Sequence, residues 1–206
     1  MMETLEKLFG SSEKVKIMKL FLFNPENAFD VGEVSVRSKV SHSLARREII
    51  NLEKAGFLKR RTYSKDILRQ KNRKMAFFKK RANGYMLNYK FAYLEPLYNF
   101  LSELNVQNPE ELIEKISKGV KLQLLIISGL FIKEEDSRVD MLIVGDNLRE
   151  AALDTIIKNL ESEIGREIRY ACFETADFKY RLSVFDRLIR DILDYPHQKV
   201  LNKLNL

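Results

Sequence analysis

The chain has 206 residues, of which 45% are hydrophobic, a proportion typical of globular proteins and too high for a disordered chain. Its longest apolar run, residues 124–127, is far too short to span a bilayer, and its first residues lack the pattern of a signal peptide. We therefore expect a cytoplasmic protein with no membrane partner. The single cysteine, Cys172, excludes an intramolecular disulfide and a cysteine-rich zinc site.

The formal net charge of +7 is unevenly distributed along the chain. Residues 1–105 contain 21 Lys and Arg against 11 Asp and Glu, whereas residues 106–206 contain 15 against 18. Between Lys59 and Arg81, 11 residues are basic and one, Asp66, is acidic. Solvated surfaces usually mix both signs, so this asymmetry favours a polyanion as the partner of the N-terminal half over a merely solubilising surface.

Two short amphipathic helices are predicted before residue 40. The first covers residues 13–23 and begins behind a pair of serines at positions 11–12, either of which can cap it. The second covers residues 31–38 and begins at Asp30, which has the capping-box spacing to Glu33.

Residues 41–56 have the pattern of a helix that lies in a DNA major groove. Ser41 is suited to the N-cap, and Gly56 to the left-handed residue that ends a helix. An apolar side formed by Leu44, Ala45, Leu52 and Ala55 lies opposite short polar residues and two arginines. An ordinary amphipathic surface helix is the alternative. The residues expected to contact DNA are Ser41, His42, Ser43, Arg46 and Arg47.

The segment after Gly56 predicts a β-hairpin with a basic tip. A strand begins within residues 57–63, a polar and basic segment follows to residue 73, and residues 75–79 form a return strand. Asn83-Gly84 marks a turn or bulge before a last short strand at residues 85–87. The basic residues expected to contact the phosphate backbone are Lys65, Arg69, Lys71 and Arg73.

Three helices followed by a basic hairpin resemble the winged-helix transcriptional regulators of the ArsR/MarR-like type. Residues 55–58 (Ala-Gly-Phe-Leu) are similar to the end of their recognition helix, and residues 85–88 (Tyr-Met-Leu-Asn) to the strand that closes their wing. The resemblance covers residues 11–90 and implies a domain over 1–90 that binds double-stranded DNA, with the recognition helix at base edges and the hairpin at phosphates or the minor groove. Winged helices also mediate protein contacts.

Residues 91–108 are predicted to form a connecting helix and a linker, with the domain boundary at 105–109. The apolar residues of the predicted helix have two interpretations. They could pack between the domains, or they could form the interface of a homodimer that places two recognition helices on two half-sites. The residues with this helical spacing are Leu94, Leu97, Tyr98, Leu101 and Leu104.

The C-terminal part, residues 109–206, predicts a small mixed α/β layer, so the chain as a whole is expected to be an α+β protein. Strands are expected at 121–128, 138–144 and 167–173, and helices at 110–117, 147–164, after Thr175, at 185–193 and from Lys199 onward.

Residues 109–175 resemble the minimal nucleotidyltransferase domain of the DNA polymerase beta superfamily. In that family a strand ends in Gly-Ser, and a later strand carries Asp-x-Asp, whose carboxylates hold Mg²⁺ together with a third acid. Here the first strand ends at Ser128-Gly129-Leu130, where Leu130 replaces the serine of Gly-Ser and lacks its hydroxyl. The later strand carries Arg138 and Asp140. Arg169 lies near the place of the third acid, for which Glu167 is the only candidate.

The resemblance, with these departures, implies a degenerate site at Gly129, Arg138 and Asp140 that has no catalytic residue, metal or cofactor. We expect Arg138 to form an ion pair with Asp140. The only histidines, His42 and His197, have no Cys or carboxylate at metal-ligand spacing, and no phosphate-binding glycine motif is present.

The sequence therefore favours a DNA-binding transcriptional regulator in which the C-terminal domain is a pseudoenzyme used for dimerisation, protein binding or ligand sensing. Two alternatives remain at this point. One is an active nucleotidyltransferase that uses the winged helix to hold its substrate, and the other is an antitoxin-like interaction protein.

Overall fold

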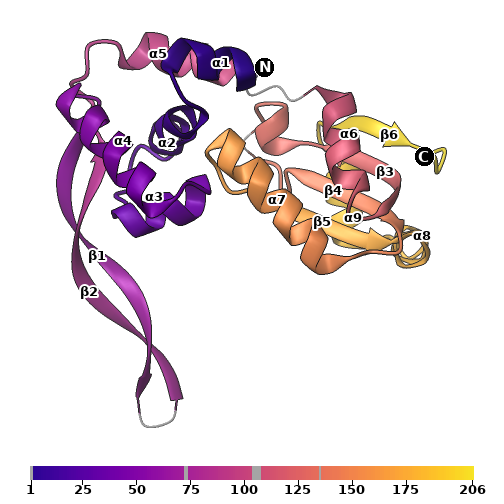
Figure 1. Cartoon of the computed structure of the whole chain (residues 1–206). Helices are drawn as coiled ribbons and strands as arrows, with labels where there is room; N and C mark the ends of the chain where they lie inside the picture. The colour runs from indigo at the N-terminus through magenta and orange to yellow at the C-terminus, as the bar shows by residue number, and fades with distance from the viewer. Residues whose placement is uncertain (1, 72–73, 104–107, 135) are drawn as a thin grey trace. The chain divides into compact units, whose positions relative to one another are not determined.

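The computed structural model describes residues 2–71, 74–103, 108–134 and 136–206; for residues 2–3, 67–71, 74–77 and 103 only the backbone is described. The helices and strands form two compact units, Met1–Leu101 with Ser162–Arg166 and Ser102–Glu161 with Glu167–Leu206. Each unit contains helices and one β-sheet, so the chain is a mixed α and β protein, as the sequence predicts (Figure 1). Within the described residues, no helix is both long and apolar enough to cross a membrane.

The first unit begins with four helices, and three of them start at the predicted caps. The hydroxyl of Ser11 accepts an amide hydrogen bond of 3.1 Å, and the hydroxyl of Ser41 does the same at the start of the fourth helix. Asp30 and Glu33 form the predicted capping box, which satisfies two amides of the first turn. The helices are α1 (Met2–Phe9), α2 (Ser12–Phe23), α3 (Val31–Ser38) and α4 (His42–Lys54).

The inward sides of these helices form one apolar core with the base of the hairpin that follows. Gly56 has a φ of +78°, the left-handed conformation predicted for it, and turns the chain from α4 into the first strand. Burial of large apolar side chains supplies the main stabilisation of the unit. The fully buried members of the core include Val15, Ile17, Phe21, Val34, Ala45, Ile49 and Phe57.

Two long antiparallel strands, β1 (Leu58–Lys71) and β2 (Lys74–Leu87), form the hairpin and extend away from the helices as a twisted ribbon (Figure 1). Each strand has 14 residues, and their register runs from Leu58 opposite Leu87 to Lys71 opposite Lys74. The prediction of a turn at Asn83-Gly84 with a separate strand after it is wrong, because β2 continues through both residues.

Gly84 does not form a turn; it allows the backbone of β2 to lie close to the backbone of Phe29. Phe29 and Tyr85 exchange two backbone hydrogen bonds of 2.9 Å, which join the segment before α3 to β2. A Cβ at Gly84 would lie 2.5 Å from the carbonyl oxygen of Phe29. A strand glycine often marks such an approach. The contact fixes the base of the hairpin against the helices.

Helix α5 (Leu94–Glu103) then follows, three residues later than the predicted start at residue 91.

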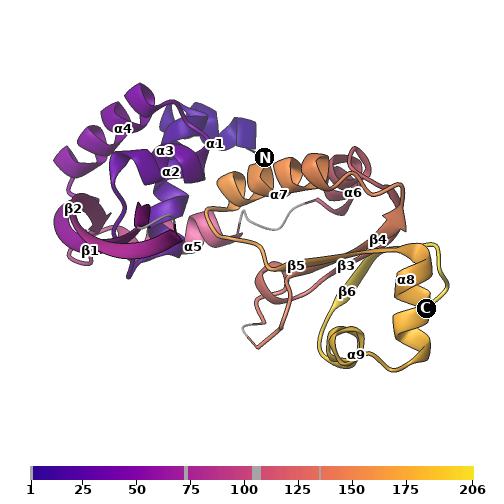
Figure 2. The same cartoon turned by 90° about the horizontal axis from the view of Figure 1, so that it is seen from below.

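The second unit is a four-stranded sheet of order β5-β4-β3-β6, in which only β4 and β5 are parallel. Helix α7 makes the crossover between these two strands. Helices α6 and α7 cover one face of the sheet and α8 and α9 the other (Figure 2). The elements are α6 (Pro109–Ser117), β3 (Lys121–Ile127), the 3-10 turn η1 (Gly129–Phe131), β4 (Met141–Asp146), α7 (Glu150–Ile164), β5 (Tyr170–Glu174), α8 (Thr175–Ser183), α9 (Arg187–Asp194) and β6 (Gln198–Asn202).

Successive side chains along β3 and β4 point to opposite faces of the sheet, so each face has its own part of the core. The side that α8 and α9 cover contains Leu124, Ile126, Leu142, Val144, Phe178 and Ile189. The predicted helix from Lys199 onward is wrong. That segment is strand β6, because pairing with the otherwise open edge of β3 outweighs its local helical pattern. Strands β4 and β5 also begin three residues later than predicted.

We predict that Gly84→Ala weakens the base of the hairpin, because the added methyl group collides with the backbone of Phe29, which cannot move aside as a side chain would. The free energy of unfolding, measured in urea, should fall by about 1–3 kcal/mol. Asn83→Ala is the matched control on the same strand. It loses one exposed hydrogen bond with Thr62 and should cost less than about 1 kcal/mol. Equal stability of Gly84→Ala and the wild type would contradict this role.

Candidate nucleic-acid interface and the Asp140 site

The N-terminal half of α4 presents the predicted DNA-contacting residues to solvent. Ser41, His42, Ser43, Arg46 and Arg47 are all exposed. A turn of three residues, 39–41, connects α3 to α4 and is fixed by local hydrogen bonds. The helix therefore has a defined position in its unit while its outer side stays free.

The inward side of α4 differs in part from the prediction. Ala45 and Leu52 are buried as expected, but Ala55 is exposed. The inward row also contains Ile49 and an acid, Glu48, which is 4% exposed. Sequence reasoning missed Glu48, although its spacing of three from Ala45 and four from Leu52 places it on the apolar side.

The two arginines of α4 have different surroundings. The Nε group of Arg47 donates a hydrogen bond of 3.1 Å to Oε1 of Glu48, and 64% of the Arg47 side chain is exposed. Arg46 has no hydrogen-bond or ion-pair partner in the part of the chain that the structure describes. Arg46 is thus available to an outside acceptor, and Arg47 is oriented by its neighbour in the helix.

Lys65, expected at the phosphate backbone, forms ion pairs within its own unit instead. Its ammonium group bonds to the carboxylate of Asp30 and lies 3.6 Å from Oε1 of Glu33. The hydroxyl of Tyr63 donates to Glu33 and accepts a bond of 3.0 Å from the amide of Asp30. This cluster of four side chains joins β1 to the N-terminus of α3, so Lys65 acts as an anchor of the hairpin.

The charges in this cluster shift the pKa values of its members. Burial alone would raise the pKa of Asp30, but hydrogen bonds from Lys65 and from the amides of Glu33 and Gly32 outweigh it and lower that pKa. The hydrogen bond to Asp30 is the main cause that raises the pKa of Lys65. Burial and the bond to Glu33 raise the pKa of Tyr63. Asp30 and Lys65 are thus both charged, and Tyr63 neutral, at neutral pH.

The other predicted hairpin contacts lie farther along the strands. The backbone positions of Arg69 and Lys71 are on the distal part of β1, and Arg73 lies outside the described residues. The expected phosphate contacts did not include six exposed basic residues nearer the base, although these belong to the same basic run. They are Lys59, Arg60, Arg61, Lys79, Lys80 and Arg81.

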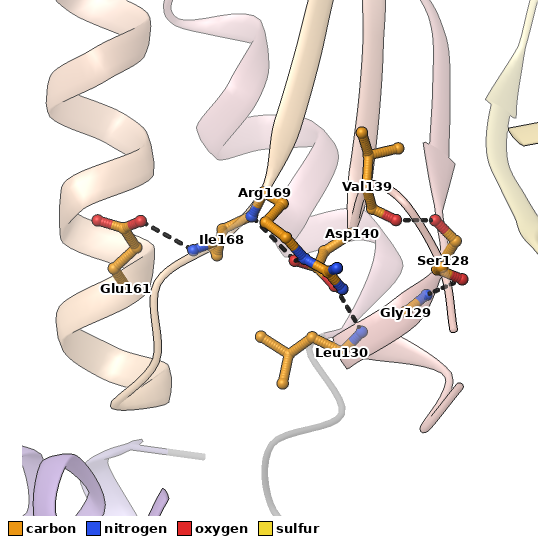
Figure 3. Close-up of polar contacts among 9 residues, drawn as sticks. Ser128, Gly129, Leu130, Val139, Asp140, Glu161, Ile168 and Arg169 are labelled. Atoms are coloured by element: carbon orange, nitrogen blue, oxygen red, sulfur yellow. Dashed lines mark hydrogen bonds and ion pairs between the residues drawn. The ribbon is translucent and has the colours of Figure 1, made fainter. Parts of the chain in front are cut away.

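In the second unit, Asp140 is 2% exposed and is surrounded by hydrogen-bond donors (Figure 3). Its Oδ2 accepts bonds from the backbone amide of Arg169 (2.9 Å) and from its Nε (3.1 Å). Its Oδ1 accepts bonds from the amide of Leu130 (2.9 Å) and from Nη2 of Arg169 (3.0 Å). A carboxylate has about four acceptor positions, so these donors occupy them all.

The turn after β3 is shaped around this carboxylate. Gly129 has a φ of +50°, and a Cβ there would collide with Oδ1 of Asp140. The amide of Gly129 donates to the hydroxyl of Ser137 (3.1 Å), and the hydroxyl of Ser128 donates to the carbonyl of Val139 (2.6 Å). Gly129 and Asp140 therefore lie side by side, whereas a degenerate nucleotidyltransferase site at these residues stays a prediction.

The predicted ion pair between Arg138 and Asp140 is wrong. Arg138 pairs with Asp191 of α9 at 2.7 Å, while the partner of Asp140 is Arg169. The prediction assumed that residues 138 and 140 lie on one strand and share a face. Strand β4 begins only at Met141, so strand alternation does not apply to them.

Arg169 occupies the position next to Asp140 that a metal ion would need. Its hydrogen bonds to Asp140 are the main cause that raises the pKa of Arg169, so the guanidinium stays charged. A divalent cation could reach the carboxylate only by displacing this group. Among the described residues, no cluster of three or more His, Cys, Asp or Glu could hold a metal ion.

Comparisons of the chain with protein-family models, with curated proteins and with solved structures give no match.

We predict that Arg169→Gln destabilises the protein by about 1–3 kcal/mol, because a buried carboxylate loses hydrogen bonds from Nε and Nη2. Arg138→Gln is the matched control. It breaks a pair between half-exposed side chains and should cost less than about 1 kcal/mol. Urea unfolding of both variants measures the difference. If the two substitutions cost the same, Arg169 has no special role at Asp140.

The lowered pKa of Asp30 predicts how the hairpin anchor depends on pH. A carboxyl group with a lowered pKa stabilises the fold above its ordinary pKa of 3.8 and loses that contribution as the pH falls through the lowered value. The stability difference between the wild type and Asp30→Asn should therefore be constant near neutral pH and shrink below pH 3.8. Unfolding in urea at a series of pH values measures it. A stability difference between the wild type and Asp30→Asn that grows in acid would contradict a lowered pKa of Asp30.

Proposed function

We propose that the protein is a sequence-specific regulator that binds double-stranded DNA, with α2, α3, α4 and the β1–β2 hairpin acting as a winged helix. The observation that carries this proposal is the exposed N-terminal half of α4, where hydroxyls, an imidazole and two arginines face outward from a fixed helix-turn-helix. The major groove of B-DNA is about 12 Å wide and admits one helix, and arginine is the side chain most often bonded to guanine there.

The hairpin supports the same proposal by its length and charge. A strand of 14 residues reaches roughly 45 Å at about 3.3 Å per residue, enough to follow a duplex well beyond the recognition helix. Exposed lysines and arginines along it, at residues 59, 61 and 79–81, supply the positive charge that a phosphate backbone attracts.

We infer that the C-terminal unit does no nucleotidyl transfer. Transfer of that kind needs carboxylates free to hold a divalent cation, whereas the acceptor positions of Asp140 are taken by Arg169 and two backbone amides. The unit would then serve dimerisation, protein binding or sensing. A homodimer in the cytoplasm, with two recognition helices about one turn of DNA apart, is the arrangement that a palindromic operator requires.

The test begins with selection of bound fragments from random duplex DNA at a stated salt concentration. On the selected sequence, Arg46→Ala should weaken the binding free energy by about 1–3 kcal/mol, which is roughly a 5- to 150-fold rise in Kd. It should also relax the preference at one base pair. Lys54→Ala is the control, because it removes the same charge from the exposed C-terminal end of α4. It should weaken all sequences slightly and alter no base preference.

Failure to select any sequence would overturn the proposal. So would an Arg46→Ala variant whose Kd and base preferences equal those of the wild type.

A further inference from the structure

Glu48 is an acid buried in the helix that carries the proposed DNA-contacting residues, and it has few partners for a buried carboxylate. Its side chain is 5% exposed, and its Oε2 atom has no hydrogen-bond partner among the described residues. The ammonium group of Lys14 in α2 forms an ion pair with that atom at 3.8 Å, a distance longer than that of a hydrogen bond. Removing one partner of an ion pair is strongly destabilising when the remaining charge is buried. Lys14 and Arg47 are 31% and 64% exposed, so loss of Glu48 would leave no buried charge.

The contact between Glu48 and Arg47 leaves most of the guanidinium free. Arginine has five N–H donors, and Glu48 takes only the one on Nε. The four on the two Nη groups have no partner in the described residues, and the side chain is 64% exposed. Fixing Nε orients the plane of the guanidinium, so Arg47 loses less conformational freedom when it binds an acceptor.

We propose that Glu48 is a positioning residue that presents the Nη edge of Arg47 to a single G·C base pair in the major groove. The inference rests on the proposed DNA-binding function and deepens it. Guanine is the matching base because its O6 and N7 atoms accept two parallel N–H bonds from one arginine. Glu48 itself does not contact DNA.

The buried negative charge of Glu48 predicts opposite effects of its loss on random and on selected DNA, which a purely structural residue would not cause. A carboxylate within α4 opposes the attraction of phosphates for the helix whatever the sequence. Loss of that charge therefore favours binding to any duplex, whereas loss of the anchor for Arg47 disfavours only the sequence with the guanine. The two effects have opposite signs.

The experiment compares Glu48→Gln with the wild type on the selected duplex and on random duplex DNA. Affinity for the selected sequence should fall about tenfold, and the preference for guanine at one position should relax. Affinity for random DNA should stay equal or rise. The melting temperature should be equal or higher. Glu48→Met, a neutral side chain of similar length, gives a second variant if Glu48→Gln does not fold.

Two further variants separate positioning from charge. Glu53→Gln removes the same charge from the same helix but releases Arg60 of β1, so it should raise affinity for all sequences and change no base preference. Arg47→Lys keeps the positive charge but loses the Nη edge. Adding Glu48→Gln to Arg47→Lys should cause no further loss of base preference.

The outcomes are distinct. Equal losses on selected and random DNA would make Glu48 merely structural and overturn the inference, as would unchanged base preferences in Glu48→Gln. Absence of any selected sequence would instead overturn the proposed function. In that case the resonance of the Arg47 Nε–H group in the free protein still decides whether Glu48 anchors Arg47. Protection from exchange that is lost in Glu48→Gln supports the anchor, and its absence in the wild type refutes it.

Discussion

The buried carboxylate of Asp140 is the constraint around which the C-terminal unit is organised. A charge at 2% exposure must be compensated, and the compensation comes from two other segments of the chain. The turn after β3 supplies the amide of Leu130, the segment before β5 supplies both the amide and the guanidinium of Arg169, and Gly129 leaves room for the oxygen atoms. These contacts join β3, β4 and β5 at one end of the sheet, so an acid that would otherwise destabilise the core holds its strands together.

Glu48 is the instructive contrast to Asp140. Both carboxylates are buried and both contact an arginine that is more than half exposed. Asp140 has two backbone amides besides the guanidinium of its arginine, whereas Glu48 has one hydrogen bond and one ion pair at 3.8 Å. A fully bonded acid is explained by the fold that surrounds it. A partly bonded acid on an otherwise exposed, arginine-bearing helix is better explained by what it does to the arginine.

Features that depend on neighbours in the chain could be predicted from the sequence, and features that depend on distant partners could not. The caps follow from side chains that reach amides three residues away. The structure confirms Asp30 and Ser41 and, of the two serines left open by the sequence, selects Ser11. The partner of Asp140 lies 29 residues away, and β6 forms only because β3 offers it an edge. Neither can be deduced from local spacing, and residue 138 was mispaired for that reason.

The anchoring of the hairpin shows why the number of basic residues alone is a poor guide to a polyanion interface. Lys65 belongs to the basic run, yet Asp30 and Glu33 neutralise it, so it contributes rigidity at the base of the ribbon. Glu53 likewise pairs with Arg60. The proposed attraction of the hairpin for phosphates would then come from the exposed basic residues without an ion pair. Its direction would come from the contacts that hold β1 and β2 to Phe29, Asp30 and Glu33. Because the base of the hairpin is rigid, its basic side chains keep a fixed orientation relative to α4 within the same unit. Sequence-specific binding of a stiff duplex requires such a preformed arrangement.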